Sequence, residues 1–209
     1  MSKALPKHAR AVIIGGGIVG CSVAYHLAKI GWKDVVLLER KALTSGTTFA
    51  AAGLVGQLRA TPALTRLAQY GTDCYAKLEE ETGQATGYRA NGSILVARTK
   101  DRTHEYDRSI ALASKFVIEM SRISAEEAKR MWPLMATDDL EALYFMPRDG
   151  EGSPVDLTQA LAKGARMGGV SFFEDTRVTD IAVEKGRVTG VSTDRGEIKT
   201  EYVVNCAGM

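Results

Sequence analysis

The sequence contains few cysteines and no disulfide framework. Its 209 residues include three cysteines, Cys21, Cys74 and Cys206, and no two of them stand in a C-x-x-C pair. Scattered single cysteines are typical of a reducing compartment, where they serve as small buried apolar residues. The residues before the first apolar run also lack the apolar core of a secretory signal. We therefore expect a cytoplasmic protein.

Long apolar runs and an excess of one charge are also missing. No segment approaches about 18 consecutive apolar residues, so we expect no membrane span. The net charge of +2 and the absence of a dense Lys/Arg run argue against a nucleic-acid partner. No His/Cys/Asp/Glu cluster has the spacing of metal ligands, and we expect no metal site. The hydrophobic content of 45% is that of an ordinary globular protein.

The sequence does contain a glycine-rich turn between a short apolar run and a helical pattern. The run at 11–14 leads into Gly15-x-Gly17-x-x-Gly20. In dinucleotide-binding units the first glycine allows the tight strand-to-helix turn and the second lets a pyrophosphate approach the backbone. The third lets the helix pack closely on the strand. A helix beginning near Ile18 would offer unpaired N–H groups to the phosphates.

A second apolar run and an acidic residue complete this βαβ unit. Gly31 ends the helical pattern, and 35–38 is an apolar run of strand length. Glu39 follows, nineteen residues after Gly20, where such units place an acid that binds a ribose. The alternative, a glycine-rich turn that binds nothing, is disfavoured by the complete unit. The pattern therefore predicts an adenine dinucleotide site.

A hydroxyl-rich loop and a run of small residues follow the acid. They include Ser45, Gly46, Thr47, Thr48, Gly53 and Leu54. Ser, Thr and Gly favour turns for local reasons, so an ordinary loop is one interpretation. The position directly after the predicted ribose acid favours another, a loop that faces the phosphates or flavin of a bound dinucleotide.

The rest of the chain mixes helices and strands. Periodicity and end signals predict helices at 62–83, 101–115, 124–133 and 156–168. A capping box at 124–127 would open the third of these helices, and Asp156 would cap the fourth. Apolar runs predict strands at 93–97, 116–118, 143–146, 170–173 and 202–205, with a loop at 148–152. The spacing at 178–183, 188–193 and 198–200 predicts a three-stranded antiparallel meander. The expected fold class is α/β: a Rossmann-like domain, a parallel sheet with an antiparallel β-meander, plus part of an α+β substrate domain.

The expected domain organisation has three segments. Residues 1–87 and 153–209 would be the two segments of the nucleotide-binding domain, and 88–152 a partial substrate or cap domain. The sequence stops after an apolar strand at Cys206–Met209, where a globular fold rarely ends. We therefore expect an N-terminal fragment whose C-terminal remainder is absent.

The order of these parts resembles the FAD-dependent oxidoreductases of the D-amino-acid-oxidase type. The motifs that carry the resemblance lie at 12–20, 38–40, 45–48 and 203–208. Segments 44–59 and 156–166 look most similar to the sarcosine/dimethylglycine dehydrogenase branch. The resemblance runs from Arg10 to the terminus. It implies FAD rather than NAD, which the glycines alone do not decide.

The resemblance implies a cofactor contact for each matched position. The pyrophosphate would lie on Gly15, Gly17, Ile18 and Gly20, and the adenosine half on Glu39, Arg40 and the backbone of Val178. The phosphates or ribityl chain would meet Ser45, Gly46, Thr47, Thr48 and Gly208, and the isoalloxazine would pass near Gly53 and Leu54.

The chain departs from this branch at one position. The branch usually carries Trp-His where this chain has Phe49-Ala50, and that histidine is bonded covalently to the flavin. Alanine has no ring nitrogen to form the bond. We therefore expect non-covalent FAD.

The resemblance implies oxidation of a C–N bond in a small secondary or tertiary amine, of the sarcosine or dimethylglycine type, by hydride transfer to flavin N5. The expected partners are this amine and an electron-transfer flavoprotein or another acceptor. A D-amino acid or glycerol 3-phosphate oxidoreductase, and a truncated non-catalytic FAD-binding fragment, are the alternatives. No catalytic residue is assigned. Arg59 is a candidate clamp for a substrate carboxylate, and a solvated surface arginine is an equal interpretation.

Overall fold

The computed structural model describes residues 4–208, which form two compact units. The first unit takes the chain up to residue 53 together with 77–87 and the segment from 153 onward, and the second takes 54–76 and 88–152. We expected 54–76 in the nucleotide-binding segment, but these residues group with the second unit. One reason is that β3 (Leu54–Val55) pairs with β7 (Gly150–Glu151).

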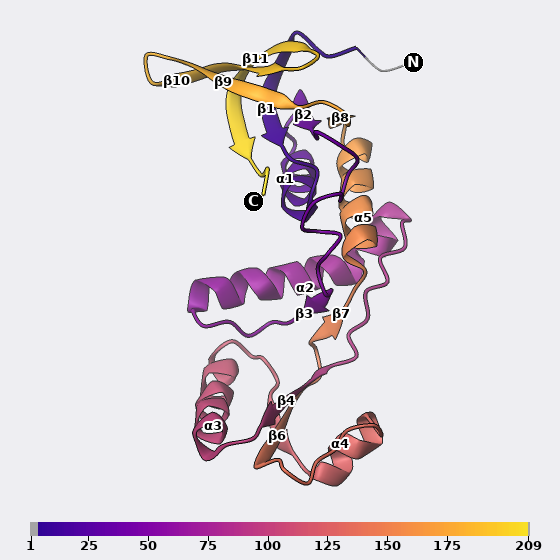
Figure 1. Ribbon diagram of the computed structural model, residues 1–209, viewed down its shortest axis with the longest axis vertical. Coiled ribbons are helices and arrows are strands. Elements are labelled where there is room, and N and C mark those ends of the chain that lie inside the picture. Colours follow the sequence, from indigo (N-terminus) through magenta and orange to yellow (C-terminus); the bar gives the residue numbers. More distant parts are fainter. Residues whose placement is uncertain (1–3, 209) are drawn as a thin grey trace. The chain divides into compact units, whose positions relative to one another are not determined.

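A six-stranded sheet forms the centre of the first unit, in the order β8-β2-β1-β11-β10-β9 (Figure 1). Its strands are β1 (His8–Ile14), β2 (Val35–Leu38), β8 (Ser171–Phe173), β9 (Val178–Glu184), β10 (Arg187–Thr193) and β11 (Gly196–Asn205). The neighbours from β8 to β11 pair in parallel, and β10 pairs antiparallel with both β11 and β9. The predicted α/β class, a parallel sheet carrying an antiparallel meander, is confirmed.

One long strand joins the meander to the parallel sheet. The sequence predicted separate strands at 198–200 and 202–205, whereas the structure has a single strand β11. Ile198 lies opposite Val191 in the antiparallel pairing with β10, and Val203 lies opposite Val12 in the parallel pairing with β1. Glu201, the polar residue between the two runs, does not end the strand, because the pairing with β1 includes both Thr200 and Tyr202.

The helices of the first unit pack closely because of glycine. They are α1 (Ile18–Lys29), α5 (Pro154–Met167) and residues 77–82 of α2 (Pro62–Thr82). α1 and α5 run side by side (Figure 1). A Cβ at Gly168 would come within 2.6 Å of the Ala28 Cβ, so a larger residue there would push the helices apart. The predicted cap of α5 was wrong: Ser153, not Asp156, is the N-cap, and its hydroxyl accepts the Asp156 N–H at 3.2 Å.

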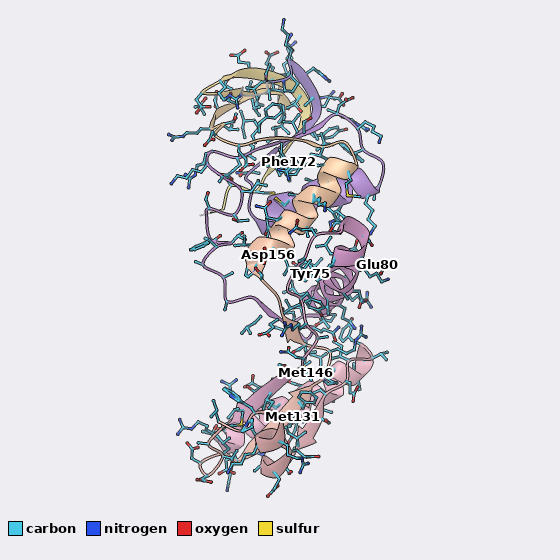
Figure 2. The ribbon with its side chains drawn as sticks, turned by 90° about the vertical axis from the view of Figure 1, so that its right-hand side faces the viewer. Tyr75, Glu80, Met131, Met146, Asp156 and Phe172 are labelled. Carbon is cyan, nitrogen blue, oxygen red and sulfur yellow. The ribbon has the colours of Figure 1, made fainter. Side chains whose placement is uncertain are left out.

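The second unit contains a three-stranded antiparallel sheet in the order β4-β6-β5. The strands are β4 (Ser93–Ala97), β5 (Ser121–Ile123) and β6 (Ala142–Met146), and two helices, α3 (Lys100–Lys115) and α4 (Ala125–Met131), lie between them in the sequence. The predicted capping box is confirmed at Ser124 and Glu127. Met146 is buried in the core of this unit, whereas Met131 is largely exposed (Figure 2).

Two sequence expectations for the second unit were wrong. The apolar run at 116–118 is no strand, because Val117 has a positive φ of 56° that turns the chain after α3. The predicted loop at 148–152 contains the short strand β7. Across residues 4–208, no helix combines the length and apolar character needed to cross a membrane.

The contact between α1 and the preceding turn gives a stability prediction. A Cβ at Gly20 would overlap the Gly15 carbonyl oxygen, which is rigid backbone. We expect Gly20→Ala to lower the free energy of unfolding by about 1–3 kcal/mol, because overpacking outweighs the helix propensity that alanine adds. Urea unfolding measures the loss. Gly46→Ala is the control, since a Cβ there meets nothing within 4 Å. Equal losses of unfolding free energy in Gly20→Ala and Gly46→Ala would show that the contact with the Gly15 carbonyl oxygen is not the cause.

Candidate functional site

The glycine-rich turn lies where three parallel strands end. The Gly15 N–H donates to the Leu38 carbonyl at the end of β2, at 2.8 Å. The Cys206 N–H, just after β11, donates to the Ile14 carbonyl at the end of β1, also at 2.8 Å. Gly15 has a φ of +111°, and a Cβ there would overlap the Cys206 carbonyl oxygen. Only glycine suits this position, which lies at the edge where α/β sheets bind ligands.

The start of α1 leaves space and backbone donors for an anion. Its N-cap, Gly17, has no side chain to cap the helix, and no acidic residue occupies the first turn. A Cβ at Gly17 would meet a single neighbour within 4 Å, the Thr48 hydroxyl oxygen at 3.1 Å. An open helix N-terminus carries a partial positive charge and unpaired N–H groups. This cradle fits a pyrophosphate.

The predicted ribose acid touches this turn directly. One carboxylate oxygen of Glu39 accepts the Gly16 N–H at 2.6 Å, and the other accepts the Lys41 N–H at 2.9 Å. Hydrogen bonds to an ionised acceptor are stronger than neutral ones, so Glu39 fixes the turn. Each carboxylate oxygen retains a further lone pair that a ribose hydroxyl can use.

The hydroxyl-rich loop docks on the turn through one of its threonines. The Thr48 hydroxyl is buried and accepts the Ile18 N–H at 3.0 Å. The Thr44 N–H donates to the Gly16 carbonyl at 3.0 Å, and Thr44 has a positive φ of 70°. The loop therefore lies across the start of α1.

The structure thus brings together part of the predicted set. The residues that meet at the turn are Gly15, Gly17, Ile18, Gly20, Glu39 and Thr48. The exposed members are Arg40, Ser45, Gly46, Thr47, Leu54 and Gly208. Val178 begins β9 and packs on the core of the first unit. Gly53 has a positive φ of 77°, and Leu54 belongs to the second unit. The cofactor contacts of all the residues in the predicted set stay predictions.

Sequence reasoning missed two residues beside the turn. Leu43 is 5% exposed, and a Cβ at Gly16 would overlap its side chain. A carboxylate oxygen of Glu174 accepts the Leu43 N–H at 2.8 Å. The sequence contained a signal for Glu174, because this residue directly follows the predicted strand at 170–173. The carboxyl ends of parallel strands lie at one edge of a sheet, so Glu174 could have been expected near Glu39. No such signal marked Leu43.

The cysteines near the turn are not reactive groups. Burial raises the pKa of the Cys21 thiol to about 12, and burial also raises the pKa of Cys206. The Cys21 thiol lies 3.7 Å from the Gly16 carbonyl oxygen. None of the three cysteines is in a disulfide. Cys21 and Cys206 therefore remain protonated near neutral pH and serve as packing residues.

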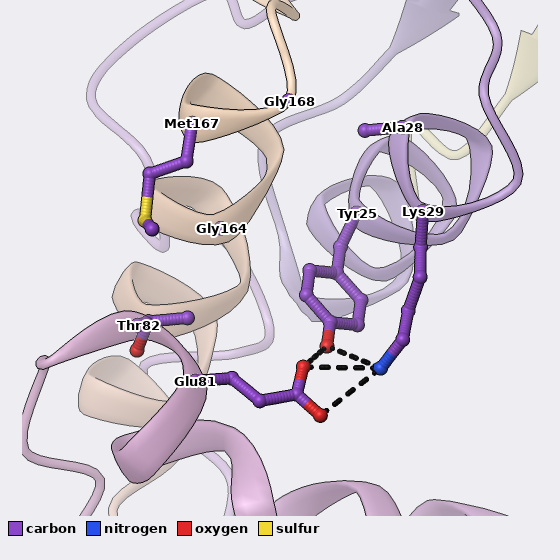
Figure 3. Close-up of a pocket in the computed structure, with 8 residues that line it drawn as sticks. All are labelled: Tyr25, Ala28, Lys29, Glu81, Thr82, Gly164, Met167 and Gly168. Atoms are coloured by element: carbon purple, nitrogen blue, oxygen red, sulfur yellow. Dashed lines mark hydrogen bonds and ion pairs between the residues drawn. The ribbon is translucent and has the colours of Figure 1, made fainter.

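A pocket of about 180 Å³ opens elsewhere in the first unit, lined by α1, α2 and α5 (Figure 3). The Tyr25 hydroxyl donates to Glu81, and Lys29 Nζ lies 3.0 Å from both groups. Hydrogen bonds from Tyr25 and Lys29 hold the pKa of the Glu81 carboxyl below its usual range. Lys29 is the last residue of α1 and Ile18 the first, so this pocket lies at the end of α1 away from the glycine turn.

The glycine turn, the start of α1 and the predicted ribose acid are together typical of a dinucleotide-binding α/β domain. The chain belongs to the FAD dependent oxidoreductase family, whose model matches residues 10–209. Within residues 4–208, no group of three or more His, Cys, Asp or Glu side chains is placed to hold a metal ion.

The relatives include dehydrogenases and a regulatory protein. Human mitochondrial sarcosine dehydrogenase is 41% identical over 214 residues, covering 100% of this chain and 23% of that protein. The mouse mitochondrial pyruvate dehydrogenase phosphatase regulatory subunit is 42% identical, covering 100% of this chain and 24% of that protein. The crystal structure of L-proline dehydrogenase from P. horikoshii has a TM-score of 0.91 and 32% identity, covering 97% of this chain and 53% of that one. The chain thus spans about a quarter of these curated relatives.

Thr48 gives a test of the docked loop. Thr48→Val removes the acceptor of the Ile18 N–H, and we expect a loss of about 1 kcal/mol in the free energy of unfolding, comparable to loss of a helix cap. Thr48→Ser keeps the hydroxyl and should retain most of the stability. Urea unfolding of both variants measures the difference. An equal loss in the serine variant, which keeps the hydroxyl, would contradict the role of the Thr48 hydroxyl.

Proposed function

We propose that this chain is the FAD-binding part of an oxidoreductase that acts on a small secondary or tertiary amine of the sarcosine or dimethylglycine type. The observation that carries the proposal is the meeting of Glu39 with the glycine turn at the carboxyl edge of the parallel sheet. Bound FAD would supply the hydride acceptor, flavin N5, for oxidation of the C–N bond. The family to which the chain belongs supports this cofactor.

The charges at the turn fit the adenosine and diphosphate half of the cofactor. The positive end of α1 attracts the diphosphate, whereas the Glu39 carboxylate beside it would repel a phosphate on the ribose. A free ribose hydroxyl can instead donate to Glu39. The site therefore favours an adenosine half whose ribose 2′-hydroxyl carries no phosphate, as in FAD.

The remaining matched positions complete the proposal. Arg40 and the backbone of Val178 would contact the adenosine half. The phosphates and ribityl chain would meet Ser45, Gly46, Thr47, Thr48 and Gly208, and the isoalloxazine would pass Gly53 and Leu54. The exposure of Arg40 and of 45–47 supports this, because these groups are available to a ligand.

An arginine in the second unit is our candidate for a substrate carboxylate. Arg59 is exposed, its guanidinium donates to the Leu58 carbonyl at 2.9 Å, and its backbone N–H donates to the Thr65 hydroxyl at 3.1 Å. The Thr65 contact holds the main chain, while the guanidinium retains donors for a carboxylate.

Electrons would pass to an electron-transfer flavoprotein or another acceptor. We further propose a cytoplasmic location, the expectation from the scattered cysteines of the sequence.

A second function is favoured by the 42% identity to the mouse regulatory subunit. In that alternative the chain binds FAD as part of a regulatory protein without turnover. The full-length parent protein, given sarcosine, dimethylglycine or a D-amino acid with a redox dye, separates the two. We expect dye reduction with the N-methylated amines. Bound flavin that no amine reduces would support the regulatory function, and reduction by D-amino acids alone would change the substrate class.

The residue at position 50 predicts how the flavin is held. Ala50 is exposed and offers no nitrogen, so we expect acid precipitation of the protein to leave all yellow colour in the supernatant. The matched variant combines Phe49→Trp with Ala50→His, the pair usual in the dehydrogenase branch. In-gel flavin fluorescence after denaturation should appear in this variant and not in the wild type. Colour that stays with the precipitated wild-type chain would refute non-covalent binding.

A further inference from the structure

A carboxylate that is distant in sequence contacts the loop that lies across the glycine turn. Glu174 follows β8, and one of its oxygens accepts the Leu43 N–H at 2.8 Å across 131 residues of sequence. Backbone bonds hold the two segments together at the same place. The Glu39 N–H donates to the Phe173 carbonyl at 2.9 Å, and the Thr176 N–H donates to the Glu39 carbonyl at 2.8 Å.

The residue that Glu174 holds is the first point of contact between the loop and the turn. The Leu43 side chain is buried over Gly16, and the next residue, Thr44, donates its N–H to the Gly16 carbonyl. Thr44 N–H and the Thr48 hydroxyl then fix the loop on the start of α1. The position of Leu43 therefore sets the position of the whole loop.

We propose that Glu174 is a positioning residue for the cofactor-binding loop: its carboxylate oxygen, by accepting the Leu43 N–H, sets the loop against the diphosphate-binding turn. The proposal rests on the proposed FAD site and adds a residue that acts through the Leu43 N–H. Without this acceptor the loop loses its fixed start, and FAD would have to order the loop on binding.

The acceptor oxygen matters here more than the negative charge. The Arg166 guanidinium lies 4.0 Å from the other carboxylate oxygen of Glu174, and the two side chains are 42% and 41% exposed. Such a pair contributes little. The Arg195 guanidinium donates instead to the Glu174 backbone carbonyl, at 3.4 Å. Arg166 also lies over the Phe172 ring, 4.3 Å from its centroid, which gives it a separate packing role. A neutral side chain with a carbonyl oxygen in the same place should therefore replace Glu174.

The test compares Glu174→Ala, Glu174→Gln and Arg166→Gln in the full chain. FAD affinity is measured by quenching of flavin fluorescence. We expect about a tenfold weaker affinity for Glu174→Ala, the upper end of what one ordinary hydrogen bond contributes. Glu174→Gln and Arg166→Gln should stay within about twofold of the wild type. Equal loss in the glutamine and alanine variants, or no loss in either, would overturn the proposal.

Hydrogen exchange at the Leu43 amide is the second readout. Without FAD, we expect faster exchange in Glu174→Ala and unchanged exchange in Glu174→Gln, because only alanine removes the acceptor. A wild-type chain that binds no FAD would refute the proposed function by itself. In that case the Leu43 amide still decides whether Glu174 fixes the loop, and unchanged exchange in the alanine variant would refute that too.

Discussion

The close backbone approach of α1 to the strand ends is the constraint on which the site depends. A Cβ at Gly20 would overlap the Gly15 carbonyl oxygen, and a Cβ at Gly15 would overlap the Cys206 carbonyl oxygen. Two glycines therefore let β1, β11 and the first turn of α1 meet at one point. Because they meet, the helix N-terminus opens at the carboxyl edge of the sheet, where a diphosphate can reach its N–H groups.

Carboxylates then organise the loops around this point. Glu39 accepts backbone N–H groups from Gly16 and Lys41, and Glu174 accepts one from Leu43. Each carboxylate follows a parallel strand, β2 or β8, so the sheet itself brings them to one edge. The Glu39 carboxylate accepts its Gly16 N–H beside the start of α1, the positive end of that helix. The edge is thus built from backbone donors fixed by acidic side chains.

Local sequence signals predicted much of this fold. The glycine spacing, the run at 35–38 and the capping box at Ser124 are set by near neighbours, and the structure has them as expected. The helix cap at Ser153 was missed because Asp156 is also a good cap residue, and Pro154 in the first turn decides between them. The prediction of a strand at 116–118 was wrong because the apolar character of these residues does not indicate the positive φ of Val117.

Long-range contacts explain the misses at the site. Leu43 and Glu174 are far apart in sequence, and only the order β8-β2-β1 brings them together. The single strand β11 was divided in the prediction because its polar centre reads as a break, whereas pairing with β1 keeps it extended. The glycines and Glu39, in contrast, lie within one βαβ unit, so their spacing alone predicted that they meet.

We infer that the chain recognises the adenosine diphosphate half of FAD through the turn at Gly15–Gly20 and Glu39. Calorimetric titration of the flavin-free chain with FAD, ADP and FMN tests this most directly. We predict that FAD and ADP bind competitively to one site and that FMN, which lacks the adenosine half, does not displace ADP. Displacement of ADP by FMN, or binding of FAD that ADP leaves unchanged, would contradict the account.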